Sequence, residues 1–190
     1  MRLLTVMSGS ASAAVDIKDL LEDTFVYYGK AKYGADPGRR YEIESDTDYV
    51  RIHKALCVIL VCAYDICQSL SRNGFCSVSV NSSKDEGVIS FCYSVKPKHK
   101  LTALIESSDS TEDAVYCLLG REAENMFMIK TLARHIRGQT DIEYDQPSDE
   151  LRLSVSAPID SSSYVKAGGA QLYDVAHIAV QTCLALRSKA

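Results

Sequence analysis

The chain has 190 residues, of which 46% are hydrophobic and 24% are charged, and its formal net charge is −4 at pH 7. A chain of this size and composition can bury a real core, which excludes wholesale disorder and favours one domain. Lys and Arg form no continuous basic patch, so nucleic acid is not an expected partner.

The seven cysteines form no CxxC pair and no zinc-type Cys/His spacing, so we expect no metal site and a reducing, cytoplasmic setting. The apolar stretch at residues 3–7 is too short for the core of a secretory signal. The apolar run from Ala55 to Tyr64 is about half as long as a membrane-spanning helix, so it predicts a buried core helix and no membrane span.

The first 14 residues are interpreted as the remnant of a preceding helix and a small, flexible link into the domain. A helix begins at Asp16, and its apolar residues recur at helical spacing at Ile17, Leu20, Leu21, Phe25 and Tyr28. After a break at residues 34–38, a short strand is predicted at 40–44. Asp46 or Thr47 then caps a long helix that runs to about Leu70, and Asn73 and Gly74 form a turn.

The second half of the chain predicts a hairpin of two strands at 75–81 and 88–95, because apolar residues alternate there with period two. Short helices follow around 101–105 and 113–119. A longer helix at 124–137 ends at Gly138, which is expected to act as a left-handed cap. Two more strands, at 139–144 and 151–157, flank a loop.

The end of the chain is interpreted as a linker at 159–169 and an amphipathic helix within 170–190. Its apolar positions are Leu172, Val175, Ala176, Ala179, Val180 and Leu184. The whole order predicts an α+β fold for residues 15–158. We expect a two-layer sandwich of a mostly antiparallel mixed sheet with helices on one face, plus the C-terminal helix.

This order of elements resembles the GHKL (Bergerat-fold) ATP-binding domain of histidine kinases. Residues 15–22 are similar to the entry helix of that family, and residues 48–63 are similar to the long helix that carries its N-box. Residues 128–138, with the strand pair that follows, resemble the last helix and the closing hairpin.

The resemblance also locates a nucleotide site, and there the chain departs from the family pattern. Two N-box asparagines correspond to Val58 and Cys62, which offer no hard oxygen to Mg²⁺. The stretch 92–97 around Tyr93 has neither the acid nor the glycine of the adenine-reading box. Residues 120–125, which end at Asn125, hold one glycine where the family has a Gly-rich loop. We therefore expect no ATP, no cofactor, no catalytic residue, and no ATPase or kinase activity.

A degenerate domain of this kind resembles the ChpT-type histidine phosphotransferases of alphaproteobacterial phosphorelays. The similar segments are Leu3-Leu4 with its link, residues 71–74 and residues 132–143. The resemblance implies a two-component signalling role, a response-regulator receiver domain as partner and, secondly, a homodimer. The phospho-accepting His of that group lies on a preceding helical hairpin and maps onto no His of this chain.

The candidate docking residues lie on the helix at 124–137: Lys130, Arg134, His135 and Arg137. For His135, an exposed helix-end cation that suits the helix dipole is the alternative interpretation. His53 is expected on the solvated surface. Asp65 is expected to face solvent or to pair locally, with a general base as the alternative. Two other functions stay open: an interaction protein of unrelated ancestry, and an atypical active ATPase or kinase of the same fold.

Overall fold

The computed structural model describes residues 12–33, 41–46, 49–83, 86–99, 101–120 and 123–159. The statements that follow concern these residues. The interpretations of residues 1–11 and of the break at 34–38 lie outside them. So do those of the linker beyond residue 159 and of the helix within 170–190.

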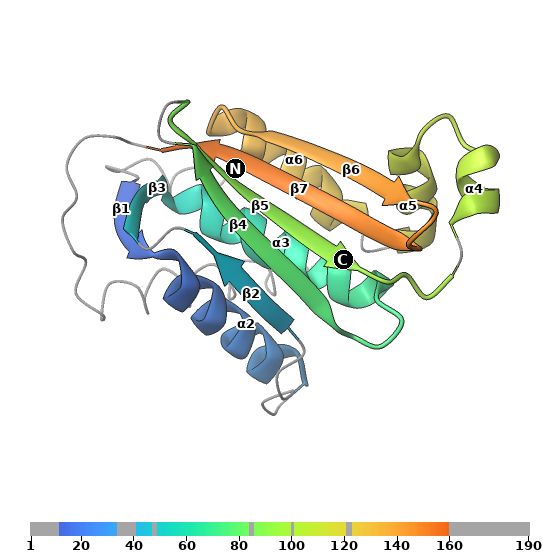
Figure 1. Ribbon diagram of the computed structural model, residues 1–190, viewed down its shortest axis with the longest axis horizontal. Coiled ribbons are helices and arrows are strands. Elements are labelled where there is room, and N and C mark those ends of the chain that lie inside the picture. The colour runs from blue at the N-terminus through green and yellow to red at the C-terminus, as the bar shows by residue number, and fades with distance from the viewer. Residues whose placement is uncertain are drawn as a thin grey trace.

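A five-stranded sheet forms one layer of the fold (Figure 1). Its spatial order is β2 (Tyr41–Ser45), β4 (Cys76–Ser83), β5 (Val88–Val95), β7 (Glu150–Pro158) and β6 (Gln139–Asp145). The pair β2 and β4 is parallel, because the chain between them crosses over through a helix, and the other three pairs are antiparallel. The predicted α+β fold with a mixed, mostly antiparallel sheet is confirmed.

The register places every buried position of the central strands β4, β5 and β7 on one face of the sheet. Val78, Tyr93 and Leu153 lie opposite one another on β4, β5 and β7, and all three are buried. The neighbouring row on the other face consists of Ser79, Cys92 and Ser154. This small, polar face agrees with the period-two pattern of a sheet that is covered on one side only.

The helices cover the apolar face. Those that contact its strands are α2 (Ile17–Tyr33), α3 (Lys54–Leu70), α5 (Thr111–Leu119) and α6 (Ala123–His135), whereas α4 (Thr102–Glu106) contacts α5 to one side of the sheet (Figure 1). The long helix α3 lies behind the sheet in Figure 1 and contacts α2, α6 and the central strands. The ring of Phe25 on α2 stacks on Tyr64 of α3 at 3.9 Å and meets Tyr93 of β5 edge-on, so α2 lies on the same face.

The start of the long helix differs from the prediction. Residues Tyr49–His53 form a strand, β3, which pairs with β1 (Ser12–Asp16) in a separate antiparallel sheet. The helix therefore begins at Lys54, and the cap is His53, whose Nδ1 accepts a hydrogen bond from the Ala55 amide at 3.1 Å. Alternating β-branched residues in Tyr-Val-Arg-Ile-His favour a strand once β1 supplies a partner, and such long-range pairing overrides a local helical pattern.

The end of α6 also differs from the prediction. Gly138 does not adopt the left-handed conformation; Arg137 does, with φ of 59°. The amides of Gly138 and Arg137 donate to the carbonyls of Ala133 and Arg134, as in a Schellman motif. Glycine is required at 138 for another reason, because a Cβ there would lie 2.3 Å from the backbone oxygen of Ser156 on β7.

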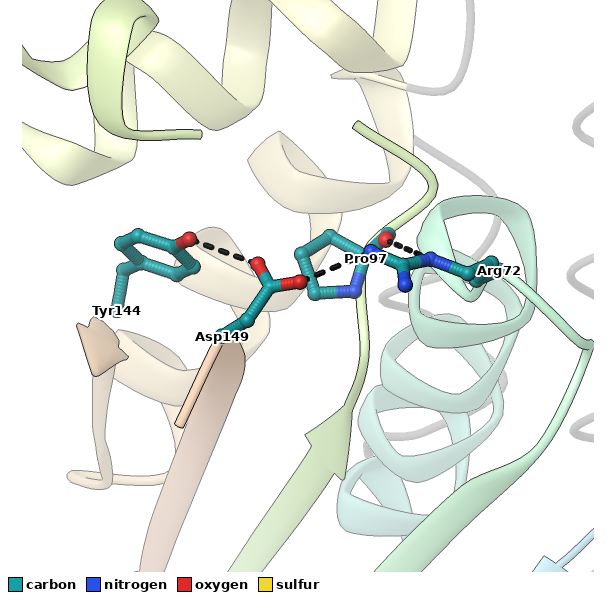
Figure 2. A network of polar contacts seen from close by, with 4 residues as sticks. All are labelled: Arg72, Pro97, Tyr144 and Asp149. Carbon is teal, nitrogen blue, oxygen red and sulfur yellow. Dashed lines mark hydrogen bonds and ion pairs between the residues drawn. The ribbon is translucent and has the colours of Figure 1, made fainter. Parts of the chain in front are cut away.

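A polar network outside the helix layer connects three segments of the chain (Figure 2). Arg72, in the turn after α3, donates to the carbonyl of Pro97 and forms an ion pair with Asp149 at 2.9 Å. Asp149 also accepts a hydrogen bond from the hydroxyl of Tyr144 at 2.8 Å. The predicted turn at Asn73 and Gly74 is present, with a φ of 69° at Gly74. The network joins the α3–β4 turn to the β6–β7 hairpin.

The apolar run from Ala55 to Tyr64 is buried at every position, as predicted for a core helix. Among the described residues, none belongs to a helix that is both long and apolar enough to cross a membrane.

Candidate functional site

Two opposite sides of α3 carry different contacts. One side faces the sheet, since the hydroxyl of Tyr93 donates to the carbonyl of Leu60 at 3.2 Å. Cys67, seven residues after Leu60 and thus on the same side, contacts Cys76 of β4. This contact, together with burial, raises the pKa of the Cys67 thiol well above its ordinary value, so the thiol is inert.

The other side of α3 carries Val58, Cys62 and Asp65, which recur at helical spacing. All three are buried, with exposed fractions of 1%, 0% and 1%. A helix that is apolar on the side away from its sheet is unusual in a two-layer fold, where that side normally meets water. This side of α3, defined by these three residues, is called the outer face of α3 below.

The centre of the candidate site is the carboxylate of Asp65. Its Oδ1 accepts a hydrogen bond from Nζ of Lys32 on α2 at 2.8 Å. Its Oδ2 accepts a hydrogen bond from Nδ2 of Asn125 on α6 at 2.6 Å. The expectation that Asp65 faces solvent or pairs locally is wrong, because its partners lie 33 and 60 positions away in the sequence.

Burial explains why Asp65 needs these two partners. A buried carboxylate without partners is costly, and a cation together with a hydrogen-bond donor offsets that cost. The side chain of Lys32 is 21% exposed, whereas that of Asp65 is 2% exposed. The network of Lys32, Asp65 and Asn125 therefore ties α2, α3 and α6 together on the side of α3 that faces away from the sheet.

The four positions that the family resemblance assigns to a nucleotide site do not gather at one place. Val58 and Cys62 lie on the outer face of α3, and Asn125 reaches that face through Asp65. Tyr93 lies on the opposite side of α3, between the helix and the sheet. Burial raises the pKa of its hydroxyl well above the ordinary value, so Tyr93 is a neutral packing residue.

The sequence pattern predicted no role for Lys32, and it predicted an Asp65 that faces solvent or pairs locally. A single acid within an apolar helix was a visible signal, because such an acid must be paired if it is buried. Nothing in the spacing of the chain indicated that its partners come from α2 and α6. Both contacts depend on how the three helices pack.

The candidate docking residues are spread along α6. Lys130 is half-buried and forms an ion pair with Glu112 of α5. Arg134, His135 and Arg137 are exposed at the C-terminal end of the helix, where cations suit the helix dipole. Phe127, one helical turn before Lys130, is 69% exposed and is an unusually exposed aromatic residue.

His135 meets His53 at the edge of this surface. Their rings make an edge-to-face contact with centroids 5.9 Å apart. The expectation that His53 is simply solvated is wrong, because it is half-buried and caps α3. Burial, and secondly the nearby His135, lowers the pKa of His53 below its ordinary value.

The described residues offer little for metal chemistry. No group of three or more His, Cys, Asp or Glu side chains among them is arranged to hold a metal ion. Asp65 is the acid nearest to Val58 and Cys62 in sequence, and both of its oxygens accept hydrogen bonds from Lys32 and Asn125. A magnesium ion at this carboxylate would have to displace those partners.

Comparison with known proteins shows similarity in structure but not in sequence. No protein-family model matches the chain, and no curated protein matches it. Among solved structures, the histidine kinase AdeS of Acinetobacter baumannii has a TM-score of 0.57 and 11% identity, over 84% of this chain and 74% of that one. A histidine kinase of Burkholderia phymatum also has a TM-score of 0.57, with 12% identity, over 84% of this chain and 76% of that one.

The catalytic domain of histidine kinase ThkA gives the same result. In a nucleotide-free form it has a TM-score of 0.50 and 8% identity, over 77% of this chain and 97% of that domain. The described chain therefore has the fold of histidine kinase catalytic domains. At this level of identity the similarity concerns the fold, and the residues of the site must support any function.

Proposed function

We propose that this chain is a histidine-phosphotransferase-like pseudo-ATPase domain of a cytoplasmic phosphorelay, which docks a receiver domain without binding ATP. The observation that carries the proposal is the hydrogen bond between Asp65 and Asn125. These residues belong to the two elements, α3 and α6, between which the resemblance places the nucleotide phosphates. Here the two elements are joined by a carboxylate and an amide.

The charge at this place supports the absence of nucleotide. An ATP phosphate chain is strongly anionic, and a buried carboxylate beside it would repel it. Magnesium could relieve this repulsion only by binding hard oxygens. Val58 and Cys62 provide none, and Asp65 is already engaged by Lys32 and Asn125.

The docking part of the proposal is supported by the exposed end of α6. Arg134 and Arg137 are exposed cations at the C-terminal end of α6, His135 lies beside them, and the exposed Phe127 about two turns before Arg134 adds an apolar contact. A rim of charge around an apolar anchor is the usual composition of a protein interface. The closeness to ChpT-type proteins rests on the sequence segments named above, because the structural similarity is to histidine kinases in general.

The matching fold weakens one alternative. An interaction protein of unrelated ancestry need not share the sheet order and helix layer of histidine kinase catalytic domains, and this chain does share them. Among the described residues of the site, none favours an active ATPase.

Calorimetric titration of the purified chain with Mg²⁺ and ATP tests the proposal. We expect no heat of binding up to millimolar nucleotide, while the catalytic domain of an active histidine kinase, titrated under the same conditions, binds. Saturable binding by this chain would refute the pseudo-ATPase assignment. Binding that disappears in an Asn125→Ala variant would place the nucleotide at α6 and favour the kinase alternative.

A further inference from the structure

The turn that follows α3 and the segment that follows β5 lie side by side at one end of the sheet. The amide of Arg72 donates to the carbonyl of Lys96, and the amide of Lys98 donates to the carbonyl of Leu70, both at 2.8 Å. The two segments also form an antiparallel bridge, and the guanidinium of Arg72 donates to the carbonyl of Pro97 (Figure 2). These bonds hold the two segments as a short antiparallel pair.

The cations of this pair gather on its solvent side. Buried and exposed side chains alternate in the segment after β5. Val95 and Pro97 are buried, and the lysines at 96 and 98 are exposed. In an extended segment this alternation places Lys96 and Lys98 on the same side, about 7 Å apart. Arg72 lies opposite Lys96 in the pair and is exposed as well. Arg72, Lys96 and Lys98 are called the basic patch below.

Repulsion within the basic patch is only partly relieved by neighbouring acids. Like charges that face one another across an antiparallel pair are destabilising. Two acids lie in the adjoining part of the β6–β7 hairpin. Asp149 pairs with Arg72 at 2.9 Å, and Glu150 pairs with an arginine of its own strand at 2.7 Å. Lys96 and Lys98 have no ion-pair partner among the residues that the structure describes. An anion from outside would offset this repulsion.

An exposed aromatic residue lies beside the basic patch. The carbonyl of Phe75 accepts a hydrogen bond from the hydroxyl of Ser71 at 2.8 Å, and its amide donates to the side chain of Asn73 at 3.0 Å. Phe75 is 37% exposed although its backbone is fixed in this way. An exposed aromatic side chain next to charged groups is a common anchor of protein interfaces.

We infer that the basic patch docks an acidic segment of a partner protein, which binds in an extended conformation beside Phe75. Acidic side chains at alternate positions of an extended peptide are about 7 Å apart, which matches the spacing of Lys96 and Lys98. Such ion pairs steer association and select the partner. A long polyanion such as a nucleic acid suits the surface less, because the net charge of the chain is −4.

The basic patch is separate from the proposed docking surface on α6. Val95, the last residue of β5, pairs with Leu151 at the start of β7. Gln139, which follows α6 closely, pairs with Ser156 near the other end of β7. Residues 151 and 156 are about 17 Å apart along a strand. The inference therefore goes beyond the proposed function, and it succeeds or fails independently of ATP and of receiver domains.

Fluorescence anisotropy of a short labelled peptide, titrated with the full chain, tests the inference. In the probe peptide glutamate alternates with threonine, and one leucine is included as the apolar residue. A second peptide of the same composition has its glutamates in one block. We expect saturable binding of the alternating peptide that weakens as salt is added, and weaker binding of the block peptide.

Variants of the full chain locate the binding. Lys96→Glu combined with Lys98→Glu should lower the affinity for the alternating peptide about tenfold or more. Phe75→Ala should also lower it, because the apolar anchor is lost. Lys18→Glu combined with Lys30→Glu, at exposed positions of α2, makes the same change in net charge and is the matched control. This control should leave the affinity nearly unchanged.

A second measurement separates a loss of binding from a loss of folding. Lys96→Glu places a carboxylate opposite Arg72, so this variant should unfold at a urea concentration no lower than the parent does, while it binds the alternating peptide more weakly. A lower urea midpoint would contradict the repulsion on which the inference depends.

Four results of the peptide titrations would overturn the inference. They are no saturable binding of the alternating peptide, equal binding of the block peptide, equal losses in the patch and control variants, and unchanged binding by Phe75→Ala. The inference also fails if an oligothymidylate of similar length displaces the peptide at a lower concentration than unlabelled peptide does, because nucleic acid would then be the preferred ligand.

Discussion

Oδ2 of Asp65 accepts a hydrogen bond from Nδ2 of Asn125 at 2.6 Å, and this bond links α3 to α6 across 60 positions of sequence. The same carboxylate holds Lys32 of α2 by its other oxygen. One buried acid thus fixes the relative positions of three helices. Without this carboxylate, the buried amide of Asn125 and the ammonium of Lys32 would lose the hydrogen bonds that they donate to it, and such losses are costly in a buried place.

Removing the carboxylate should therefore cost far more than an ordinary surface substitution. We expect Asp65→Ala to lower the free energy of unfolding by about 3 kcal/mol, because it leaves the Lys32 ammonium and the Asn125 amide without their acceptor. Urea denaturation followed by circular dichroism measures the change. Asp141→Ala, on the exposed edge strand β6, is the control and should stay within about 0.5 kcal/mol of the parent. Equal effects of the two changes would contradict the structural role of the network.

The left-handed residue at the end of α6 gives a prediction of opposite sign. Arg137 has φ of 59°, a conformation that costs a residue with a Cβ about 1 kcal/mol and costs glycine almost nothing. We expect Arg137→Gly to raise the free energy of unfolding by about 0.5–1 kcal/mol, less than the full strain because glycine also frees the unfolded chain.

The control for Arg137→Gly lies three residues earlier. Arg134 is inside the last turn of α6, where glycine should instead cost about 1 kcal/mol. Thermal or urea unfolding measures the change in unfolding free energy of the Arg137→Gly and Arg134→Gly variants. If both substitutions destabilise, the strain assigned to Arg137 is absent.

Gly138 is required for space, not for its backbone angles. A Cβ would lie 2.3 Å from the backbone oxygen of Ser156, so Gly138→Ala must push β7 away from the end of α6. We expect a loss of about 2 kcal/mol in unfolding free energy. Gly87→Ala provides the contrast, because nothing lies within 4 Å of its Cβ and only the strain at φ of 63°, about 1 kcal/mol, should appear. A smaller loss at Gly138 than at Gly87 would contradict the close approach.

Local patterns in the sequence were enough to predict most of the elements. The alternation at Cys76, Val78 and Val80 is a property of one strand, and the structure confirms it. The apolar spacing from Ile17 to Tyr28 likewise predicted α2 and its buried side. Such patterns report which side of an element is buried, which is information that a short window contains.

The features that the sequence did not reveal depend on contacts between distant segments. Strand β3 forms because it pairs with Ser12–Asp16 of β1. Taken without that partner, residues Tyr49–His53 fit the start of the predicted long helix. The partners of Asp65 come from two other helices, so the spacing around Asp65 carries no sign of them. Gly138 was recognised as special, but the reason lies in Ser156, which follows it by 18 positions in a neighbouring strand.

The proposed docking surface predicts a charge-dependent partner. We expect the double change Arg134→Glu and Arg137→Glu to weaken binding to a receiver domain about tenfold and to reduce its dependence on salt, because rim charges act mainly on association. A panel of purified receiver domains, titrated by calorimetry at two salt concentrations, measures this. Arg152→Glu, on the open face of the sheet, should leave binding unchanged. If no receiver binds, or if both variants bind as the parent does, the docking proposal for α6 is refuted.

The contact between His53 and His135 predicts a loss of stability on the acid side. The folded state lowers the pKa of His53, through burial and then through His135, below the unfolded value of about 6.5. As the pH falls through 6.5, the unfolded chain therefore takes up the proton first, and folding stability falls with it. Above that pH both states are neutral at this site, so the contribution no longer changes.

Urea unfolding between pH 5.5 and 7.5 should show stability rising with pH, with a smaller rise in His53→Gln and an intermediate one in His135→Gln. The matched control is His99→Gln, since His99 is exposed and should leave the slope as it is in the parent. A parent slope that His53→Gln does not reduce would assign the pH dependence to other groups.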